Sequence, residues 1–212
     1  MLRLLDHRPL CAEENLAFDS ALFQAVEGGA DDETLRLWES AEYAVVVGRS
    51  GVISSEVEEE TCAADGVAVL RRDSGGGAVL LGPGCMSFSL LLPLGKHPQL
   101  RNVRLSYRRI LTSLVRALAV PGLEMRDDSD LAIGGRKVSG NAQFRGRRGL
   151  LHHGTLLYQF NALRVERYLR PPARQPEYRA ERSHLNFLGN LPLSRDQVRA
   201  RLARLPEFLA WE

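Results

Sequence analysis

The chain has 212 residues, of which 44% are hydrophobic and 25% are charged. These proportions are typical of a folded globular protein and exclude general disorder. No apolar run approaches the roughly 20 residues that a membrane-spanning helix needs, and the amino terminus lacks the apolar stretch of a secretory signal. We therefore expect a cytoplasmic protein with one domain over residues 1–212, in which residues 171–212 form a C-terminal extension.

The formal net charge of +2 is too small to indicate a nucleic-acid partner. The basic residues are distributed unevenly by type, since Lys96 and Lys137 are lysines and the other 26 are arginines. Where arginine fills nearly every basic position, a lysine indicates a site that needs a compact ammonium group. Lys96 follows a glycine in a loop and is expected to be exposed, so Lys137 is the candidate functional lysine.

The three cysteines, Cys11, Cys62 and Cys85, have none of the spacings of a zinc site or a Cys-x-x-Cys motif. An odd number of cysteines in a reducing compartment argues against a disulfide framework. Each cysteine is expected to be a small buried apolar residue.

The first half of the chain mixes helical and extended patterns. A helix is expected over Ala12–Glu27, where apolar residues recur on one face and two glycines follow. Those apolar residues are Leu16, Leu22, Phe23 and Val26. Ser55 and Glu58 have capping-box spacing and predict a short helix to about residue 64. Strands are expected at residues 35–39, 43–47, 67–70 and 86–92.

The second half begins with the longest amphipathic pattern, which predicts a helix over residues 102–120. A hairpin is expected from strands 130–133 and 136–144 around Gly134-Gly135, followed by a strand over 150–160. Two helices are expected at 162–169 and 194–205, and the proline-rich residues 171–192 between them are expected to form an ordered loop. Hairpins without regular βαβ alternation favour an α+β fold with a mixed, largely antiparallel sheet flanked by helices.

A glycine-rich segment follows the strand at 67–70 and reads Arg-Arg-Asp-Ser-Gly-Gly-Gly-Ala-Val over residues 71–79. Consecutive glycines let backbone N–H groups approach a phosphate or carboxylate, and Arg72 can add a charge-assisted clamp. The spacing is neither that of the P-loop nor that of the dinucleotide fingerprint. A tight surface turn is the alternative interpretation of the same pattern.

The segment around Lys137 reads Gly-Gly-Arg-Lys-Val-Ser-Gly-Asn-Ala-Gln over residues 134–143. On a regular strand Lys137, Ser139 and Asn141 share one face, so we expect the three side chains to point the same way. If that face is the floor of a pocket, Lys137 can neutralise charge that develops between a carboxylate and a phosphate. A solvated hairpin face is the alternative, and the scarcity of lysine favours the pocket.

A third segment reads Leu-His-His-Gly-Thr-Leu-Leu over residues 151–157. Adjacent histidines on a strand point to opposite faces and are poor partners for one metal ion. We expect one of them to be a hydrogen-bonded core histidine and the other to approach the pocket.

Together these three segments resemble the lipoate–protein ligase A family, within the biotin/lipoate ligase and octanoyltransferase superfamily. Residues 14–19, 36–38 and 48–49 are also similar to that family, in the same order, so the resemblance covers about residues 1–170. It implies a catalytic domain like those of biotin ligases and class II aminoacyl-tRNA synthetases. It also implies that ATP and lipoate, or octanoate, form acyl-AMP. The acyl group then passes to a lysine of a lipoyl carrier domain of the 2-oxoacid dehydrogenase E2 or glycine cleavage H protein type.

The resemblance implies a role for each matching residue. Lys137 would be the catalytic residue, in contact with the acyl carbonyl and the α-phosphate, and Asp130 would lie near Mg²⁺ and the phosphates. The other residues expected to bind ATP and the acyl-adenylate come from the three segments. They are Arg72, Ser74, Gly75, Gly76, Gly77, Ala78, Val79, Leu80, Ser139, Gly140, Asn141, His153, Gly154 and Thr155.

Two departures from the family pattern leave alternatives open. Residues 81–85 read Leu-Gly-Pro-Gly-Cys, where family ligases usually carry His-Asp-x-Gly-Asn. The small C-terminal domain of typical ligases has no counterpart in the sequence, so a separate accessory-domain protein is an expected partner. One alternative is an ATP-independent octanoyl or lipoyl transferase that forms a thioester on Cys85. Another is a non-catalytic homologue that binds an acyl-adenylate or a carrier domain. Biotin ligation is a weaker alternative function, since the sequence lacks the motif Gly-Arg-Gly-Arg-x-Gly-Arg.

Overall fold

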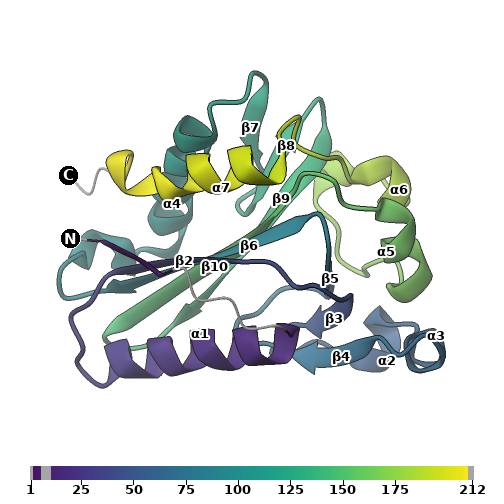
Figure 1. Cartoon of the computed structure of the whole chain (residues 1–212), viewed down its shortest axis with the longest axis horizontal. Coiled ribbons are helices and arrows are strands. Elements are labelled where there is room, and N and C mark those ends of the chain that lie inside the picture. The colour runs from purple at the N-terminus through teal and green to yellow at the C-terminus, as the bar shows by residue number, and fades with distance from the viewer. Residues whose placement is uncertain (1, 6–10, 210–212) are drawn as a thin grey trace.

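The structure, a computed structural model, describes residues 2–5 and 11–209 (Figure 1). Its strands form a large and a small sheet. The large sheet contains β1 (Arg3–Leu5), β2 (Thr34–Trp38), β6 (Cys85–Pro93), β7 (Leu123–Arg126), β8 (Asp130–Ile133), β9 (Arg136–Arg145) and β10 (Gly149–Leu157). The small sheet contains β3 (Ala44–Val47), β4 (Ala68–Arg71) and β5 (Val79–Leu81).

The helices lie on both sides of the large sheet. They are α1 (Ala12–Glu27), α2 (Ile53–Glu56), α3 (Glu59–Ala64), α4 (Val103–Leu118), α5 (Ala162–Tyr168), α6 (His184–Phe187) and α7 (Arg195–Ala203). Short 3-10 turns are η1 (Pro98–Arg101), η2 (Glu177–Arg179) and η3 (Leu205–Glu207). Figure 1 shows α4 and α7 on one face of the large sheet, and α1 with the small sheet on the other.

The order of strands in the large sheet is β1-β2-β6-β10-β9-β8-β7, and that in the small sheet is β4-β3-β5. Neighbouring strands of the large sheet run antiparallel except for the β1–β2 pair, and the small sheet has one parallel and one antiparallel pair. The predicted α+β fold with a mixed, largely antiparallel sheet flanked by helices is therefore confirmed.

The hydrophobic core lies between the large sheet and α4. Even-numbered residues of β6 and β10, among them Phe88, Leu90 and Leu156, point toward this helix because successive side chains of a strand alternate between faces. Helix α4 completes the core with residues such as Ile110 and Leu114, which recur on one face as predicted.

Helix α1 has the predicted bounds, but its buried face differs from the prediction. Asn15 and Asp19 are buried with Phe23, whereas Leu16 and Leu22 are only half-buried. The reason is an ion pair under the helix, in which Arg36 Nη1 lies 2.8 Å from Asp19 Oδ1 and is fully buried. Burial raises the pKa of Asp19, and the charge of Arg36 opposes that shift. A charge inside the protein needs such partners, so polar residues occupy helix positions that a pattern of apolar residues does not reveal.

Three further predictions about local structure were wrong or incomplete. Ser55 does not cap a helix, because it lies within α2, and α3 begins at Glu59 without a side-chain cap. The short strands β1, β5 and β7 were not predicted, since three or four residues carry too little alternation to indicate a strand. Residues 171–192 contain the short turns of η2 and α6 within the expected loop.

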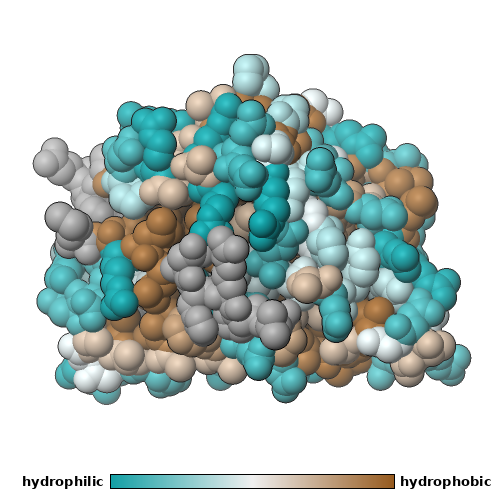
Figure 2. All heavy atoms as spheres, in the orientation of Figure 1, coloured by the Kyte–Doolittle hydropathy of each residue, from teal (hydrophilic) through white to brown (hydrophobic). Residues whose placement is uncertain are grey.

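The surface of the described residues carries hydrophobic side chains in separate places. Figure 2 shows hydrophilic residues over most of one face, with hydrophobic areas between them. The large hydrophobic residues that are exposed are Leu4, Val52, Val103, Leu163 and Leu185. Within residues 2–5 and 11–209, no helix combines the length and the apolar character that crossing a membrane requires.

Candidate active site

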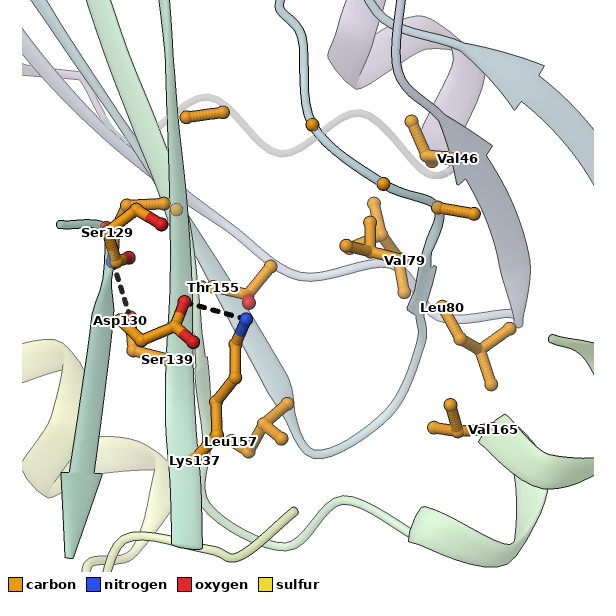
Figure 3. A pocket seen from close by; sticks show the side chains of 18 of the residues that line it. Val46, Val79, Leu80, Ser129, Asp130, Lys137, Ser139, Thr155, Leu157 and Val165 are labelled. Carbon is orange, nitrogen blue, oxygen red and sulfur yellow. Dashed lines mark hydrogen bonds and ion pairs between the residues drawn. The ribbon is translucent and has the colours of Figure 1, made fainter. Parts of the chain in front are cut away.

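A cavity of about 310 Å³ lies where the large sheet faces the small sheet. Strands β6, β9 and β10 contribute one wall, and β3, β5 and α5 contribute the opposite wall. Figure 3 shows Asp130, Lys137 and Thr155 on the first wall. Apolar side chains line much of the remainder, among them Val46, Val79, Leu80, Leu157, Val165 and Leu169. The cavity therefore combines a charged region with an apolar interior.

Lys137 and Asp130 form an ion pair inside this cavity. Lys137 Nζ lies 2.7 Å from Asp130 Oδ1, and the Asp130 side chain is almost fully buried. The hairpin of β8 and β9 brings the two residues together because Asp130 is paired with Gly140. Gly140 leaves room for the lysine, since a β-carbon there would lie 2.9 Å from Lys137 Cε. The structure thus directs the candidate catalytic ammonium group into the cavity.

The prediction that Lys137, Ser139 and Asn141 share one face of the strand is wrong. A register shift in the β8–β9 pairing places Lys137 opposite Ala132 and Ser139 opposite Leu131, so one extra residue interrupts the alternation. The Lys137 side chain lies on the cavity face with Gly140, whereas the side chain of Asn141 points to the α4 face, toward His152. Ser139 and Asn141 nevertheless belong to the cavity lining, as predicted.

The position of Asn141 gives an independent check of this assignment. Its Oδ1 atom lies 2.1 Å from the place that a β-carbon of Gly154 would occupy, next to the ring of Phe88 in the α4 core. Gly154 therefore makes room for the Asn141 side chain on the core side of the sheet, while Ser139 and Asn141 remain part of the cavity lining. Asn141 Nδ2 donates to Ser139 Oγ at 3.1 Å.

The adjacent histidines occupy opposite faces, as predicted. His152 is fully buried on the α4 side, where Gln143 Nε2 lies 3.0 Å from its Nδ1 atom. His153 lines the cavity, and its Nε2 atom lies 2.6 Å from Ser74 Oγ. Burial lowers the pKa of each imidazole to about 3, so both are neutral near pH 7. The His153–Ser74 hydrogen bond joins β10 to the glycine-rich segment across the cavity.

The glycine-rich segment is a turn that holds its own arginine. Arg72 donates from Nη2 to the carbonyl oxygens of Gly75 and Gly77, at 2.8 and 2.9 Å, and from Nη1 to that of Val46 at 3.0 Å. Its Nε atom donates to Ser74 Oγ at 3.0 Å. Burial lowers the pKa of Arg72 to about 10. The guanidinium group thus fixes the shape of the segment, and Arg72 also lines the cavity.

Glycine is required at Gly76 by its backbone conformation, and at Gly48 in the neighbouring loop by close approach of the backbone. Gly76 has a φ of +94°, in the left-handed region that favours glycine, and its carbonyl oxygen would lie 2.0 Å from a β-carbon at Gly48. The segment therefore packs directly on the loop after β3. Gly77, Ala78, Val79 and Leu80 continue along the cavity wall.

Sequence reasoning missed several residues that contact this site, among them Glu56 and Tyr178. Glu56, at the end of α2, accepts a hydrogen bond at 2.6 Å from the backbone N–H of Ala78 and lines the cavity. Tyr178, in η2, donates its hydroxyl hydrogen to Asp130 Oδ2 at 2.7 Å. Neither residue belongs to a recognisable motif, and both reach the site from segments distant in sequence, so no local signal identifies them.

Cys85 does not face the cavity as an accessible thiol. It begins β6, is 1% exposed, and packs in a hydrophobic cluster with residues such as Leu80, Leu157 and Phe160. Burial raises the pKa of the Cys85 thiol to about 12, and the charge of Glu39 adds to this effect. A thiol that stays protonated at neutral pH is a poor nucleophile. The expectation that Cys85 is a buried apolar residue is confirmed.

The acidic residues of the cavity could contribute to binding a metal ion only together with other ligands. Within the described part of the chain, no cluster of three His, Cys, Asp or Glu side chains could hold a metal ion. Mg²⁺ in nucleotide sites is usually held by one or two carboxylates, with phosphate oxygens and water as the other ligands. Asp130 fits that role because it lies beside Lys137 on the cavity wall.

Comparisons with known proteins were consistent with one another. Residues 11–203 match the model of the lipoyl protein ligase A/B catalytic domain. The chain is 32% identical over 196 residues to lipoate-protein ligase A of Psychrobacter cryohalolentis, an alignment that covers 92% of this chain and 50% of that protein. It therefore spans half the length of this relative.

Two solved structures share the fold. One belongs to a bi-partite lipoate protein ligase studied with its E2 lipoyl domain from Thermoplasma acidophilum, with a TM-score of 0.79 at 23% identity. The match covers 96% of this chain and 81% of that one. The other is a lipoate-protein ligase A bound with ATP, with a TM-score of 0.80 at 23% identity, covering 96% and 83% of the two chains.

Proposed function

The chain belongs to the lipoyl protein ligase A/B catalytic-domain family, and on that premise we propose that it is an ATP-dependent lipoate–protein ligase. In the first step the carboxylate of lipoate, or of octanoate, attacks the α-phosphorus of ATP. Acyl-AMP forms and pyrophosphate leaves. In the second step the ε-amine of an acceptor lysine attacks the acyl carbonyl, and AMP leaves with the bonding electrons. We place this activity in the cytoplasm.

The observation that carries this proposal is the Lys137 ammonium group, held by a buried carboxylate beside an apolar cavity. Both steps develop negative charge on oxygen atoms around the α-phosphorus or the acyl carbonyl. A fixed ammonium group in a partly buried site stabilises that charge more than it would in bulk solvent. Asp130, at 2.7 Å, fixes the position of the ammonium group.

The rest of the cavity suits an acyl-adenylate. An aliphatic chain would lie among the valine and leucine side chains, where its burial contributes about 0.8 kcal/mol for each CH₂ group. The glycine-rich segment, from Ser74 to Leu80, would lie along the phosphate and acyl groups, and its backbone N–H groups suit anionic oxygens. Thr155 and His153 line the same cavity and would contact the acyl portion.

Mg²⁺ would be held by Asp130 together with phosphate oxygens of ATP. The ion would supply positive charge that neutralises the phosphate groups. Asp130 is already paired with Lys137, so carboxylate, lysine and phosphate would form one local charge network.

The proposed partners follow from the second step. The acceptor is a lysine of a lipoyl carrier domain, of the 2-oxoacid dehydrogenase E2 or glycine cleavage H protein type. Because a bi-partite lipoate protein ligase shares the fold of this chain, we also propose a separate accessory-domain protein that contributes to the first step.

The test is lipoate-dependent exchange of pyrophosphate into ATP by the wild-type chain, with and without an accessory-domain protein. Lys137→Ala is expected to lower the rate at least about 100-fold, the size typical of a lost electrostatic stabiliser. Lys96→Ala is the matched control, because Lys96 is the other lysine of the chain and pairs with Asp31 on the surface. Exchange that survives Lys137→Ala would contradict the proposed mechanism.

A second experiment isolates the second step. Preformed lipoyl-AMP and a carrier domain are mixed with the chain, and the mass of the carrier is followed. An increase by one lipoyl group supports ligation, whereas binding of lipoyl-AMP without transfer supports the non-catalytic alternative.

A further inference from the structure

The carboxylate of Asp130 is held from two sides. Its Oδ1 atom pairs with Lys137 Nζ at 2.7 Å, and its Oδ2 atom accepts a hydrogen bond from the Tyr178 hydroxyl at 2.7 Å. The residue is 4% exposed, so water has little access to either oxygen. The orientation of the carboxylate is therefore set by a lysine and a tyrosine from different parts of the chain.

Tyr178 is itself fixed by neighbours outside the motifs. Its ring centroid lies 5.1 Å from that of Phe187 in α6, and its carbonyl oxygen accepts a hydrogen bond from Arg182 Nη2 at 2.7 Å. Arg182 also donates from Nη2 to the carbonyl oxygen of Gly135, in the turn between β8 and β9. The segment that carries Tyr178 is thus tied directly to the hairpin that carries Lys137.

We propose that Tyr178 is a positioning residue, whose hydroxyl orients Asp130 and through it holds the Lys137 ammonium group in the cavity. This inference rests on the proposed ligase function and adds to it a residue from the C-terminal segment. Asp130 alone can rotate about its side-chain bonds, and the ammonium group that pairs with it would then follow. A second hydrogen bond removes that freedom, which is how a supporting residue keeps a reacting group within a fraction of an ångström of its place.

The chemistry of the tyrosine suits this role. The Tyr178 hydroxyl donates its hydrogen to Asp130 Oδ2 at 2.7 Å, and a hydroxyl is the kind of group that can restrain a carboxylate without adding charge. The hydroxyl is uncharged and leaves the net charge of the cavity unchanged. Its removal therefore tests geometry rather than charge.

The first test compares two tyrosines with the same local contact. Tyr178→Phe is expected to lower kcat for lipoate-dependent pyrophosphate exchange about tenfold, with little change in KM for lipoate, because one hydrogen bond to a charged group is lost. Tyr158→Phe is the matched control, since the Tyr158 hydroxyl also donates to a carboxylate, Glu39 Oε1, at 2.7 Å and outside the cavity lining. The control is expected to stay within about twofold of wild type. Equal effects of the two substitutions would overturn the proposal.

A double-mutant cycle tests whether Tyr178 acts through Asp130. If it does, Tyr178→Phe has little further effect on kcat in an Asp130→Asn background, and the two changes are not additive. Full additivity would mean that Tyr178 acts independently of Asp130 and would overturn the proposal.

A spectroscopic readout does not depend on activity. The chain has two lysines, so lysine labelled at Cε with an NMR-active isotope gives two signals, from Lys96 and Lys137. Tyr178→Phe is expected to move the Lys137 signal and leave the Lys96 signal in place. An unmoved Lys137 signal counts against positioning even if the wild-type chain activates no acyl substrate, whereas a moved signal without activity counts only against the ligase function.

Discussion

The side chain of Lys137 lies across the backbone of Gly140, in space that a β-carbon would occupy. An added β-carbon would lie 2.9 Å from Lys137 Cε and 3.0 Å from Nζ. The contact joins two residues of one strand that are three positions apart, and the register shift in the β8–β9 pairing makes it possible. The glycine therefore has a specific role, which is to leave room for the ammonium group.

Gly140→Ala is expected to displace the lysine without unfolding the protein. The atoms that the new methyl group meets are the far end of a flexible side chain, so the free energy of unfolding should change by less than about 1 kcal/mol. A displacement of about 1 Å at a reacting group can lower kcat about 10- to 100-fold. Pyrophosphate exchange and urea denaturation measure the two effects. Gly95→Ala is the control, because a β-carbon there meets no other atom within 4 Å. Unchanged exchange in Gly140→Ala would show that the lysine position does not matter.

Arg72→Lys tests the self-contained structure of the glycine-rich segment. Lysine keeps the positive charge, but its single ammonium group cannot donate to all four oxygen atoms that the planar guanidinium group of Arg72 reaches. We expect the free energy of unfolding to fall by about 2 kcal/mol and KM for ATP to rise about tenfold, since hydrogen bonds of a charged group are lost. Urea denaturation measures the free energy of unfolding, and pyrophosphate-exchange kinetics measure KM for ATP. Arg108→Lys, at an exposed position of α4, should leave both quantities near wild type. A lowered kcat with an unchanged KM would point instead to direct contact of Arg72 with the reacting atoms.

Cys85→Ala distinguishes ligation from acyl transfer through a thioester. Because Cys85 is buried and its thiol pKa is raised to about 12, we expect the variant to keep kcat for ligation within about threefold of wild type. Mass spectrometry after incubation with an octanoyl carrier should find no acyl group on the wild-type chain. In the native protein iodoacetamide should modify the half-buried Cys11 before Cys85. An octanoyl adduct on Cys85 would favour the transferase alternative.

The pH dependence of stability should follow His152 and His153, whose pKa values are both lowered in the folded protein. The pKa of His152 is about 3 in the folded protein and about 6.5 in the unfolded chain. Between these values the unfolded chain binds the proton and the folded protein does not, so stability is full above pH 6.5 and is lost as the pH falls toward 3.

His152→Gln removes one group that binds a proton in the unfolded chain but not in the folded protein. The free energy of unfolding should therefore fall less steeply as the pH is lowered. Within that window each such histidine contributes at most about 1.4 kcal/mol per pH unit to the slope. Urea unfolding at intervals from pH 7 to pH 4 measures the slope for wild type and variant. Parallel curves would mean that His152 is protonated in the folded protein.

Local patterns were sufficient to predict much of the fold. The structure confirms the end of α1 at Gly28 and the start of α4 after Asn102. Both could be predicted because a helix end depends on residues within one turn. The β8–β9 hairpin was predicted from Gly134-Gly135, since that turn needs positive φ at both residues. The motif around Lys137 could also be located from neighbouring residues, because it follows this turn directly and contains one of the two lysines of the chain.

Contacts between distant segments could not be predicted in this way. Tyr178 reaches Asp130 from 48 residues away, and Glu56 reaches Ala78 from 22 residues away. The hydrogen bonds that hold Arg72 in place could not be predicted either, because one of its acceptors, Val46, lies on a neighbouring strand of the small sheet.

The amino-acid sequence by itself determined the long helices and the longer strands, and which three segments carry the unusual chemistry, because those properties depend on near neighbours in the chain. The tertiary structure alone decided which face of β9 each side chain occupies. One extra residue in the β8–β9 pairing directs the Lys137 side chain into the cavity, whereas the Asn141 side chain points to the opposite face of β9. Such a register shift depends on how two strands pair and pack against their neighbours. The alternation of residues along one strand therefore does not predict it.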